Sequence, residues 1–77
     1  MNHTTGPLSK KARKRVADYR KGVFAERGLV FKDLARLADL SFSMVDKWMN
    51  GYRTSDPCAK AFETLTRMPA FPEERAA

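Results

Sequence analysis

The stretch FKDLARLADLSFSMVDKWMNGYRTSDP, from Phe31 to Pro57, decides the fold class expected for this chain. Its pattern rests on five apolar positions, which are Leu34, Ala35, Leu40, Val45 and Trp48. The first two belong to one short helix, the third follows a turn, and the last two lie three residues apart on a second helix. This spacing lets two helices cross steeply while the outer face of the second stays free. In a basic chain, such a free face usually contacts the major groove of DNA.

Apolar periodicity predicts another helix before this stretch. It begins near Lys10 behind a Ser9 cap and stops at Gly28. Its inner stripe consists of Ala12, Val16, Tyr19, Val23 and Phe24. The next helix is expected over about residues 32–38.

The third and fourth helices complete the expected bundle. Ser41 caps the third helix, which runs to about residue 49 and ends at Gly51. Asp56 caps the fourth helix, with Pro57 at its first position, and this helix runs to about residue 68. The residues expected to face inward from it are Ala61, Phe62, Leu65 and Met68. The predicted fold is therefore all-α, a compact bundle of four to five helices without strands.

The net charge lies in the first third of the chain. The 77 residues carry a formal charge of +6 at pH 7, with a pI near 9.9. Residues 1–28 hold eight basic and two acidic residues, whereas the seven basic and seven acidic residues after them cancel. We expect a polyanion as the partner of this basic segment. A core this small is thinly stable, and a second subunit would stabilise it.

Three segments are expected along the chain. Residues 1–9 form a flexible polar arm, residues 10–69 the helical domain and residues 70–77 a C-terminal tail. Phe71 in the tail either folds back onto the core or contacts a second subunit. The run KKARKR, Lys10 to Arg15, is either the start of the first helix or a basic arm.

On these residues the chain resembles the lambda-repressor-like, or Cro-type, helix-turn-helix family. The matching positions are Leu34, Ala35, Leu40, Ser41, Val45, Trp48, Asn50, Gly51 and Arg53. The resemblance covers about residues 10–68 and implies a helix-turn-helix bundle, usually dimeric, that binds operator DNA with its third helix. The family has glycine in the turn where this chain has Asp39. Aspartate tolerates a positive φ better than most residues, at a cost below about 1–2 kcal/mol.

The outer face of the third helix is the predicted base-reading surface. Its members are Ser41, Phe42, Ser43, Asp46 and Lys47. Serine bonds to several bases, aspartate accepts from cytosine N4, and lysine suits guanine or a phosphate. Phe42 stands where the family often has glutamine or arginine, and its ring can pack on a thymine methyl group. The alternative for Phe42 and Met44 is contact with protein, within the fold or on a partner.

A second set of residues is predicted to bind phosphates of the DNA backbone. It comprises Lys10, Lys11, Arg13, Lys14, Arg15, Lys32, Asn50, Tyr52 and Arg53. In the family, residues that follow the third helix contact the backbone, and Lys32 lies at the positive end of the second helix. Arg13, Arg20 and Arg27 recur every seven residues. They share one side of the first helix and are expected to extend the basic patch.

The sequence predicts neither catalysis nor a cofactor. The sole histidine, His3, lies on the arm, and no carboxylate pair, glycine-rich phosphate loop or metal-ligand cluster is recognisable. Cys58 is expected to be a small buried residue, the alternative being a thiol with a lowered pKa near a helix N-terminus. One cysteine, no signal peptide and no long apolar run predict a cytoplasmic protein. The resemblance implies a bacterial host cell and association with the nucleoid. No membrane or small-molecule partner is expected.

The expected function is transcriptional regulation. The simplest form is a repressor that binds a palindromic operator in double-stranded DNA as a homodimer and blocks RNA polymerase, like the small phage or plasmid repressors that the chain resembles. The alternative is a protein-interaction module, derived from a helix-turn-helix, whose third helix antagonises a host regulator. A cationic membrane-active helix ranks third, because the apolar stripes are committed to a bundle core.

Overall fold

The computed structural model describes residues 8–75, and all regular secondary structure in that range is helical. The elements are α1 (Lys10–Glu26), α2 (Phe31–Ala38), α3 (Phe42–Met49), α4 (Asp56–Thr66) and a single turn, α5 (Pro72–Arg75). Four helices of eight or more residues thus build the molecule, and the all-α prediction is confirmed. Most of the expected flexible arm, residues 1–7, and the last two residues of the tail lie outside the described range.

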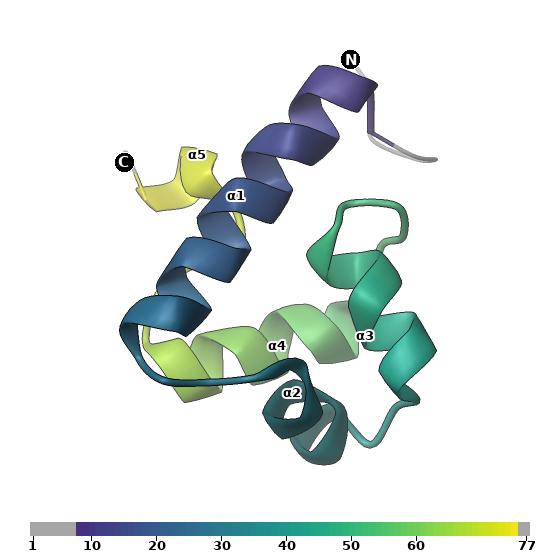
Figure 1. Cartoon of the computed structure of the whole chain (residues 1–77), viewed down its shortest axis with the longest axis vertical. Helices are drawn as coiled ribbons and strands as arrows, with labels where there is room; N and C mark the ends of the chain where they lie inside the picture. Colours follow the sequence, from purple (N-terminus) through teal and green to yellow (C-terminus); the bar gives the residue numbers. More distant parts are fainter. Residues whose placement is uncertain (1–7, 76–77) are drawn as a thin grey trace.

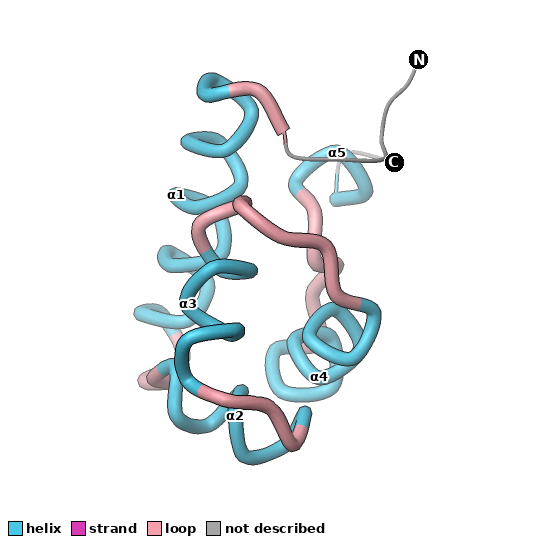
Figure 2. The backbone as a smooth tube through the Cα atoms, turned by 90° about the vertical axis from the view of Figure 1, so that its right-hand side faces the viewer, coloured by secondary structure: helices cyan, strands magenta, loops and turns pink. Residues whose placement is uncertain are grey.

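The long helix α1 lies across a group formed by the three shorter helices α2, α3 and α4 (Figure 1). In that view α2 is seen nearly end-on while α3 rises beside it, so the two helices cross steeply. α2 packs against both α3 and α4, and α1 packs against α3. In the side view, α3 stands above α2 and no described helix covers its outer side (Figure 2). The turn before α3 contains Asp39 in the left-handed conformation, at φ 58°, which confirms that aspartate can replace glycine there.

Serine side chains begin three of the helices. The hydroxyl oxygens of Ser9, Ser41 and Ser55 accept hydrogen bonds of 3.1–3.2 Å from the backbone N–H three residues further on. These bonds satisfy donors that a helix start leaves unpaired. The predicted caps of α1 and α3 are confirmed, but for α4 the cap is Ser55, not Asp56. Asp56 is already helical, and Pro57 follows it inside the first turn, where its missing N–H costs nothing.

The core is centred on Phe62 of α4. Its ring stacks on Phe24 of α1, with 5.4 Å between centroids, and contacts Trp48 of α3 at 5.7 Å. Val45 and Trp48, the predicted anchors of α3, are 0% and 1% exposed, so these predictions are confirmed. The predicted Ala35 of α2 is partly buried and packs against the same cluster. The other buried apolar residues are Val16, Ala17, Val23, Leu34, Met49, Cys58, Ala61 and Ala70.

α4 ends two residues earlier than predicted, at Thr66. The Thr66 hydroxyl donates to the Phe62 carbonyl oxygen at 2.7 Å and accepts from the Met68 N–H at 3.1 Å. Arg67 then takes the left-handed conformation, at φ 61°, which stops the helix. Thr66 is consequently buried, whereas Leu65 and Met68, both predicted to face the core, are only partly buried.

The row of α1 arginines was predicted to extend an exposed basic patch, and for Arg20 this prediction was wrong. Arg20 is only 1% exposed and lies between the rings of Trp48 and Phe71, with its guanidinium carbon 3.5 Å and 4.7 Å from their centroids. Its Nε donates to the Ala70 carbonyl oxygen at 2.9 Å, and its Nη1 donates to that of Trp48. Burial lowers the pKa of Arg20 to about 9, so the guanidinium still carries its charge at neutral pH.

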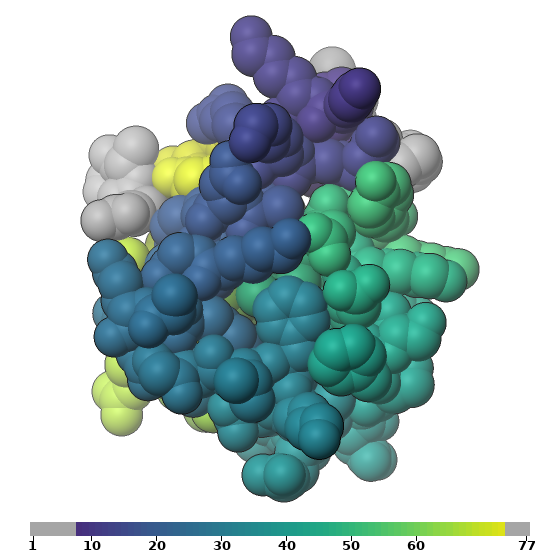
Figure 3. Space-filling model, in the orientation of Figure 1, coloured from purple at the N-terminus to yellow at the C-terminus, as the bar shows by residue number. Residues whose placement is uncertain are grey.

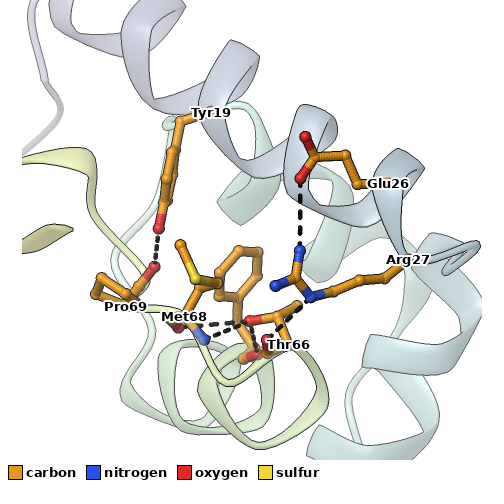
Figure 4. Close-up of polar contacts among 7 residues, drawn as sticks. Tyr19, Glu26, Arg27, Thr66, Met68 and Pro69 are labelled. Carbon is orange, nitrogen blue, oxygen red and sulfur yellow. Dashed lines mark hydrogen bonds and ion pairs between the residues drawn. The ribbon is translucent and has the colours of Figure 1, made fainter.

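The other two members of the row also contact the protein. Arg27 donates from Nε to the Thr66 carbonyl oxygen at 3.0 Å, at the end of α4 (Figure 4). Arg13 donates from Nη1 to the Leu8 carbonyl oxygen at 2.8 Å. Carbonyl groups at helix ends lack N–H partners, and a guanidinium supplies five donors. Arg20 and Arg27 therefore tie α1 to the ends of α3 and α4.

The segment after α4 folds back onto α1. The Tyr19 hydroxyl donates to the Pro69 carbonyl oxygen at 2.6 Å (Figure 4), and Ala70 is 1% exposed. Phe71 is partly buried against Arg20 and the core, so the first of its two alternatives is the one observed. α5 also packs against α1. Residues 70–75 thus belong to the globule.

Candidate nucleic-acid interface

α3 buries one side and presents the other to solvent. The five predicted base-reading residues are all exposed: Ser41, Phe42, Ser43, Asp46 and Lys47. The helix is held by its inner side, through Val45 and Trp48. The Ser41 hydroxyl already accepts from the Met44 N–H as the helix cap. Ser43 and Lys47 have no side-chain hydrogen bond or ion pair to other described residues, so their polar groups are available to a partner.

Phe42 lies at the start of the exposed face of α3. The residue is 53% exposed. One side of its ring packs against Phe31 of α2, with 6.0 Å between the ring centroids. Phe31 in turn contacts Phe24 of the core, at 6.4 Å. Phe42 is therefore anchored by protein on one side and open on the other. Of the two alternatives for Phe42, contact with protein within the fold is observed, and packing on a thymine methyl group stays a prediction.

Asn50 closes α3 instead of pointing away from the molecule. Its Nδ2 donates to the Asp46 carbonyl oxygen at 2.8 Å and to the Asp46 carboxylate at 3.3 Å. The amide donors expected to bind a phosphate are thus engaged with the helix itself. The same contact orients the Asp46 carboxylate on the outer face of α3.

The segment that follows α3 lies directly against α1. Gly51 has φ 81°, and a Cβ atom added to it would lie 3.1 Å from the Cα of Arg13. The Arg13 guanidinium carbon lies 4.6 Å from the centre of the Tyr52 ring, a cation–π contact. The Tyr52 N–H donates to the Lys47 carbonyl oxygen at 2.9 Å, so this segment also folds back on the last turn of α3. Only glycine permits both the positive φ and the close approach of α1.

This contact creates a shallow pocket of about 210 Å³ between α1 and the end of α3. Its lining consists of Lys10, Arg13, Lys14, Ala17, Asn50 and Tyr52. On the face shown in Figure 3, the first turns of α1 meet the segment after α3. Five residues predicted separately to bind phosphates are thereby brought to one place from two distant parts of the sequence. Lys32 and Arg53 are exposed but do not line this pocket.

Two of the predicted phosphate ligands form exposed ion pairs within the chain. Lys14 Nζ lies 3.1 Å from Asp18 and Arg15 Nη2 lies 3.1 Å from Glu73. All four side chains are more than half exposed, and pairs of this kind contribute little free energy. Neither pair therefore fixes its basic side chain strongly. Lys10 and Lys11 form no ion pair with another described residue. The KKARKR run itself is the start of α1, the first of its two alternatives.

No family model, curated protein or solved structure matches this chain.

The sequence does not reveal one contact in this region. Gly51 was recognised as a helix end, but its contact with Arg13 joins residues that are far apart in the chain.

Cys58 is 0% exposed, as expected for a small buried residue, and burial raises the pKa of its thiol. The alternative of a lowered pKa was therefore wrong. Within residues 8–75, no group of three His, Cys, Asp and Glu residues is placed to hold a metal ion, and no helix is long and apolar enough to span a bilayer.

Proposed function

We propose that this protein is a sequence-specific DNA-binding regulator that inserts the outer face of α3 into the major groove. The observation that carries the proposal is the two-sided character of α3, with Val45 fully buried and Ser43 and Lys47 free on the opposite side. The steep crossing of α2 and α3 suits the helix-turn-helix arrangement that the sequence resembles. The basic first turns of α1 supply attraction to the phosphate backbone that does not depend on sequence.

The dimensions and chemistry of α3 fit this role. A helix with its side chains is about 10–12 Å across, and the major groove is about 12 Å wide. Lys47 donates to guanine, Ser43 bonds to several bases, and the oriented Asp46 carboxylate accepts from cytosine N4. The open side of the Phe42 ring packs on a thymine methyl group. This face has few bidentate donors, so one copy reads a short half-site.

Action as a homodimer follows from that limited face. Two copies on a palindromic operator place their α3 helices about 34 Å apart, in successive major grooves, and double the number of base contacts. A dimer bound at a promoter represses by excluding RNA polymerase. This mechanism needs only occupancy of the DNA, which a small helical globule provides.

The test is selection of binding sites from random-sequence duplexes, followed by affinity measurements on the selected site and on a scrambled one. We expect nanomolar affinity for the selected site. Lys47→Ala and Ser43→Ala should each reduce discrimination by about 5- to 150-fold, because a good base contact contributes about 1–3 kcal/mol. The matched control is Lys60→Ala, an exposed lysine on α4, which should leave discrimination unchanged. Equal, weak binding to all duplexes would overturn the proposal.

The exposed apolar groups favour one other function, a protein-interaction module that antagonises a host regulator. Val30 and Phe42 are 58% and 53% exposed. Val30 precedes Phe31 in the sequence, and the Phe42 ring contacts the Phe31 ring. A protein partner covering them would gain from burial of apolar surface. Under this alternative, Phe42→Ala abolishes binding to the regulator while selection from random duplexes yields no preferred site.

A further inference from the structure

We infer that the pocket between α1 and the segment after α3 is a binding site for a single phosphate of the DNA backbone, formed by Lys10, Lys14 and Tyr52. The inference rests on the proposed function and adds to it a specific contact. It makes α1 part of the DNA-reading surface: the first two turns of α1 hold the backbone beside the bases that α3 reads.

The charge of the pocket selects an oxyanion. The residues that line the pocket include the cationic Lys10, Arg13 and Lys14 and the hydroxyl-bearing Tyr52, and none of them is acidic. The ammonium groups are compact point charges with three donors each, and a tyrosine hydroxyl donates a further hydrogen bond. Two acidic residues lie nearby. Asp18 pairs with Lys14 at 3.1 Å in an exposed contact, and Asp46 is engaged by the Asn50 amide.

The two sides of the pocket are held together before any ligand binds. Arg13 stacks on the Tyr52 ring at 4.6 Å, and its Nη1 is fixed by the Leu8 carbonyl oxygen. Gly51 brings the backbone of this segment against the backbone of α1. Tyr52 remains 57% exposed despite the stacking. Arg13 is therefore a positioning residue, whereas the lysines and the tyrosine hydroxyl are the phosphate ligands.

The position of the pocket relative to α3 fixes which phosphate is bound for a given position of α3 along the bases. Because the Tyr52 N–H donates to the Lys47 carbonyl oxygen at 2.9 Å, the pocket lies next to the last turn of α3. A phosphate bound there stands in a fixed relation to the base that Lys47 contacts. A diffuse basic surface would neutralise many phosphates weakly, but this pocket engages one phosphate in each half-site.

The first measurement compares two double variants with equal loss of charge. Lys10→Gln/Lys14→Gln removes the pocket lysines, and the matched control Lys21→Gln/Lys60→Gln removes two exposed lysines that do not line it. Affinity for duplex DNA is measured from 50 to 200 mM salt. The pocket variant should lower the logarithmic salt slope by about 0.9 per protomer, so over this fourfold range its affinity falls about 3.5-fold less than that of the wild type for each bound protomer, or about 12-fold less for a dimer. The control should keep the wild-type slope, and equal slopes for both variants would overturn the inference.

The second measurement replaces single phosphates of the bound duplex by neutral methylphosphonates. We expect the replacement at one position in each half-site to weaken binding of the wild type, and to weaken binding of Tyr52→Phe to a different extent. The same replacement should not change binding of the Lys10→Gln/Lys14→Gln variant. If the loss of affinity from the lysine substitutions and the loss from each methylphosphonate added independently at every position, the inference would be overturned. The lysines would then act only as diffuse charge. Melting temperatures of all variants verify folding.

Failures of the two proposals are distinguishable. If the wild type selects no duplex sequence, the proposed function fails, but the salt slopes on an arbitrary duplex still test the pocket. If a selected duplex exists and the methylphosphonate positions show no coupling, only the pocket is refuted. Inorganic phosphate serves as a separate probe: saturable binding to the pocket without any coupling to duplex phosphates would mark a site for free phosphate and would overturn the assignment to DNA.

Discussion

Among single residues, Asp39 adopts a left-handed backbone conformation that glycine takes more readily than aspartate does. It closes α2 at φ 58° and ψ 47°, and the Leu40 N–H then reaches the Ala35 carbonyl oxygen at 3.0 Å. Glycine takes this conformation without steric cost. We expect Asp39→Gly to raise the free energy of unfolding by about 0.5–1 kcal/mol, and Asp39→Ala to lower it by a similar amount. Urea denaturation measures both, and an alanine variant as stable as the glycine variant would contradict the explanation.

Among the elements, α1 approaches the segment after α3 closely, and this contact is sensitive to added volume. Two glycines allow the cost of a positive φ to be separated from the cost of an added Cβ atom. Gly28 has φ 67° with no atom near an added Cβ, whereas Gly51 has φ 81° and meets Arg13 at 3.1 Å. Gly28→Ala should lower the free energy of unfolding by about 1 kcal/mol from backbone strain alone. Gly51→Ala should lower it by about 2–3 kcal/mol, because overpacking adds to the same strain. Thermal denaturation gives both values, and equal losses would show that the approach of α1 is not tight.

For the whole molecule, the sequence predicts the helices and their buried faces, which follow from helix geometry. It does not predict contacts between segments that are far apart in the chain. Spacings of three and four residues predicted the helices to within two residues at their ends, and placed Val45 and Trp48 inside. The exposure of the outer face of α3 follows from the same geometry, while its contact with DNA stays a prediction. The burial of Arg20 depends on carbonyl groups 28 and 50 residues away, which no local pattern reveals. An arginine in a basic run is indistinguishable by sequence from its exposed neighbours.

Arg20 is also the residue on which the assembly of the molecule depends most, since it joins α1, the end of α3 and the segment after α4. Arg20→Ala would leave the carbonyl oxygens of Trp48 and Ala70 without these donors and open a cavity beside the rings. We expect the free energy of unfolding to fall by about 3 kcal/mol or more. A domain of this size has about 4–12 kcal/mol in total, so the variant should be close to unfolding at physiological temperature.

Two further variants keep this prediction decisive. Arg20→Lys retains the charge but loses the planar stack on Trp48, and should cost about 1–2 kcal/mol. Lys21→Ala, at the exposed neighbouring position, should change stability by less than about 0.5 kcal/mol. Trp48 is the sole tryptophan, so its fluorescence during urea denaturation reports on the arginine site directly. The order of stability should be wild type and Lys21→Ala first, Arg20→Lys next and Arg20→Ala last. An Arg20→Ala protein as stable as Lys21→Ala would mean that α1 is held by its apolar stripe alone, and that the buried guanidinium adds no net stability.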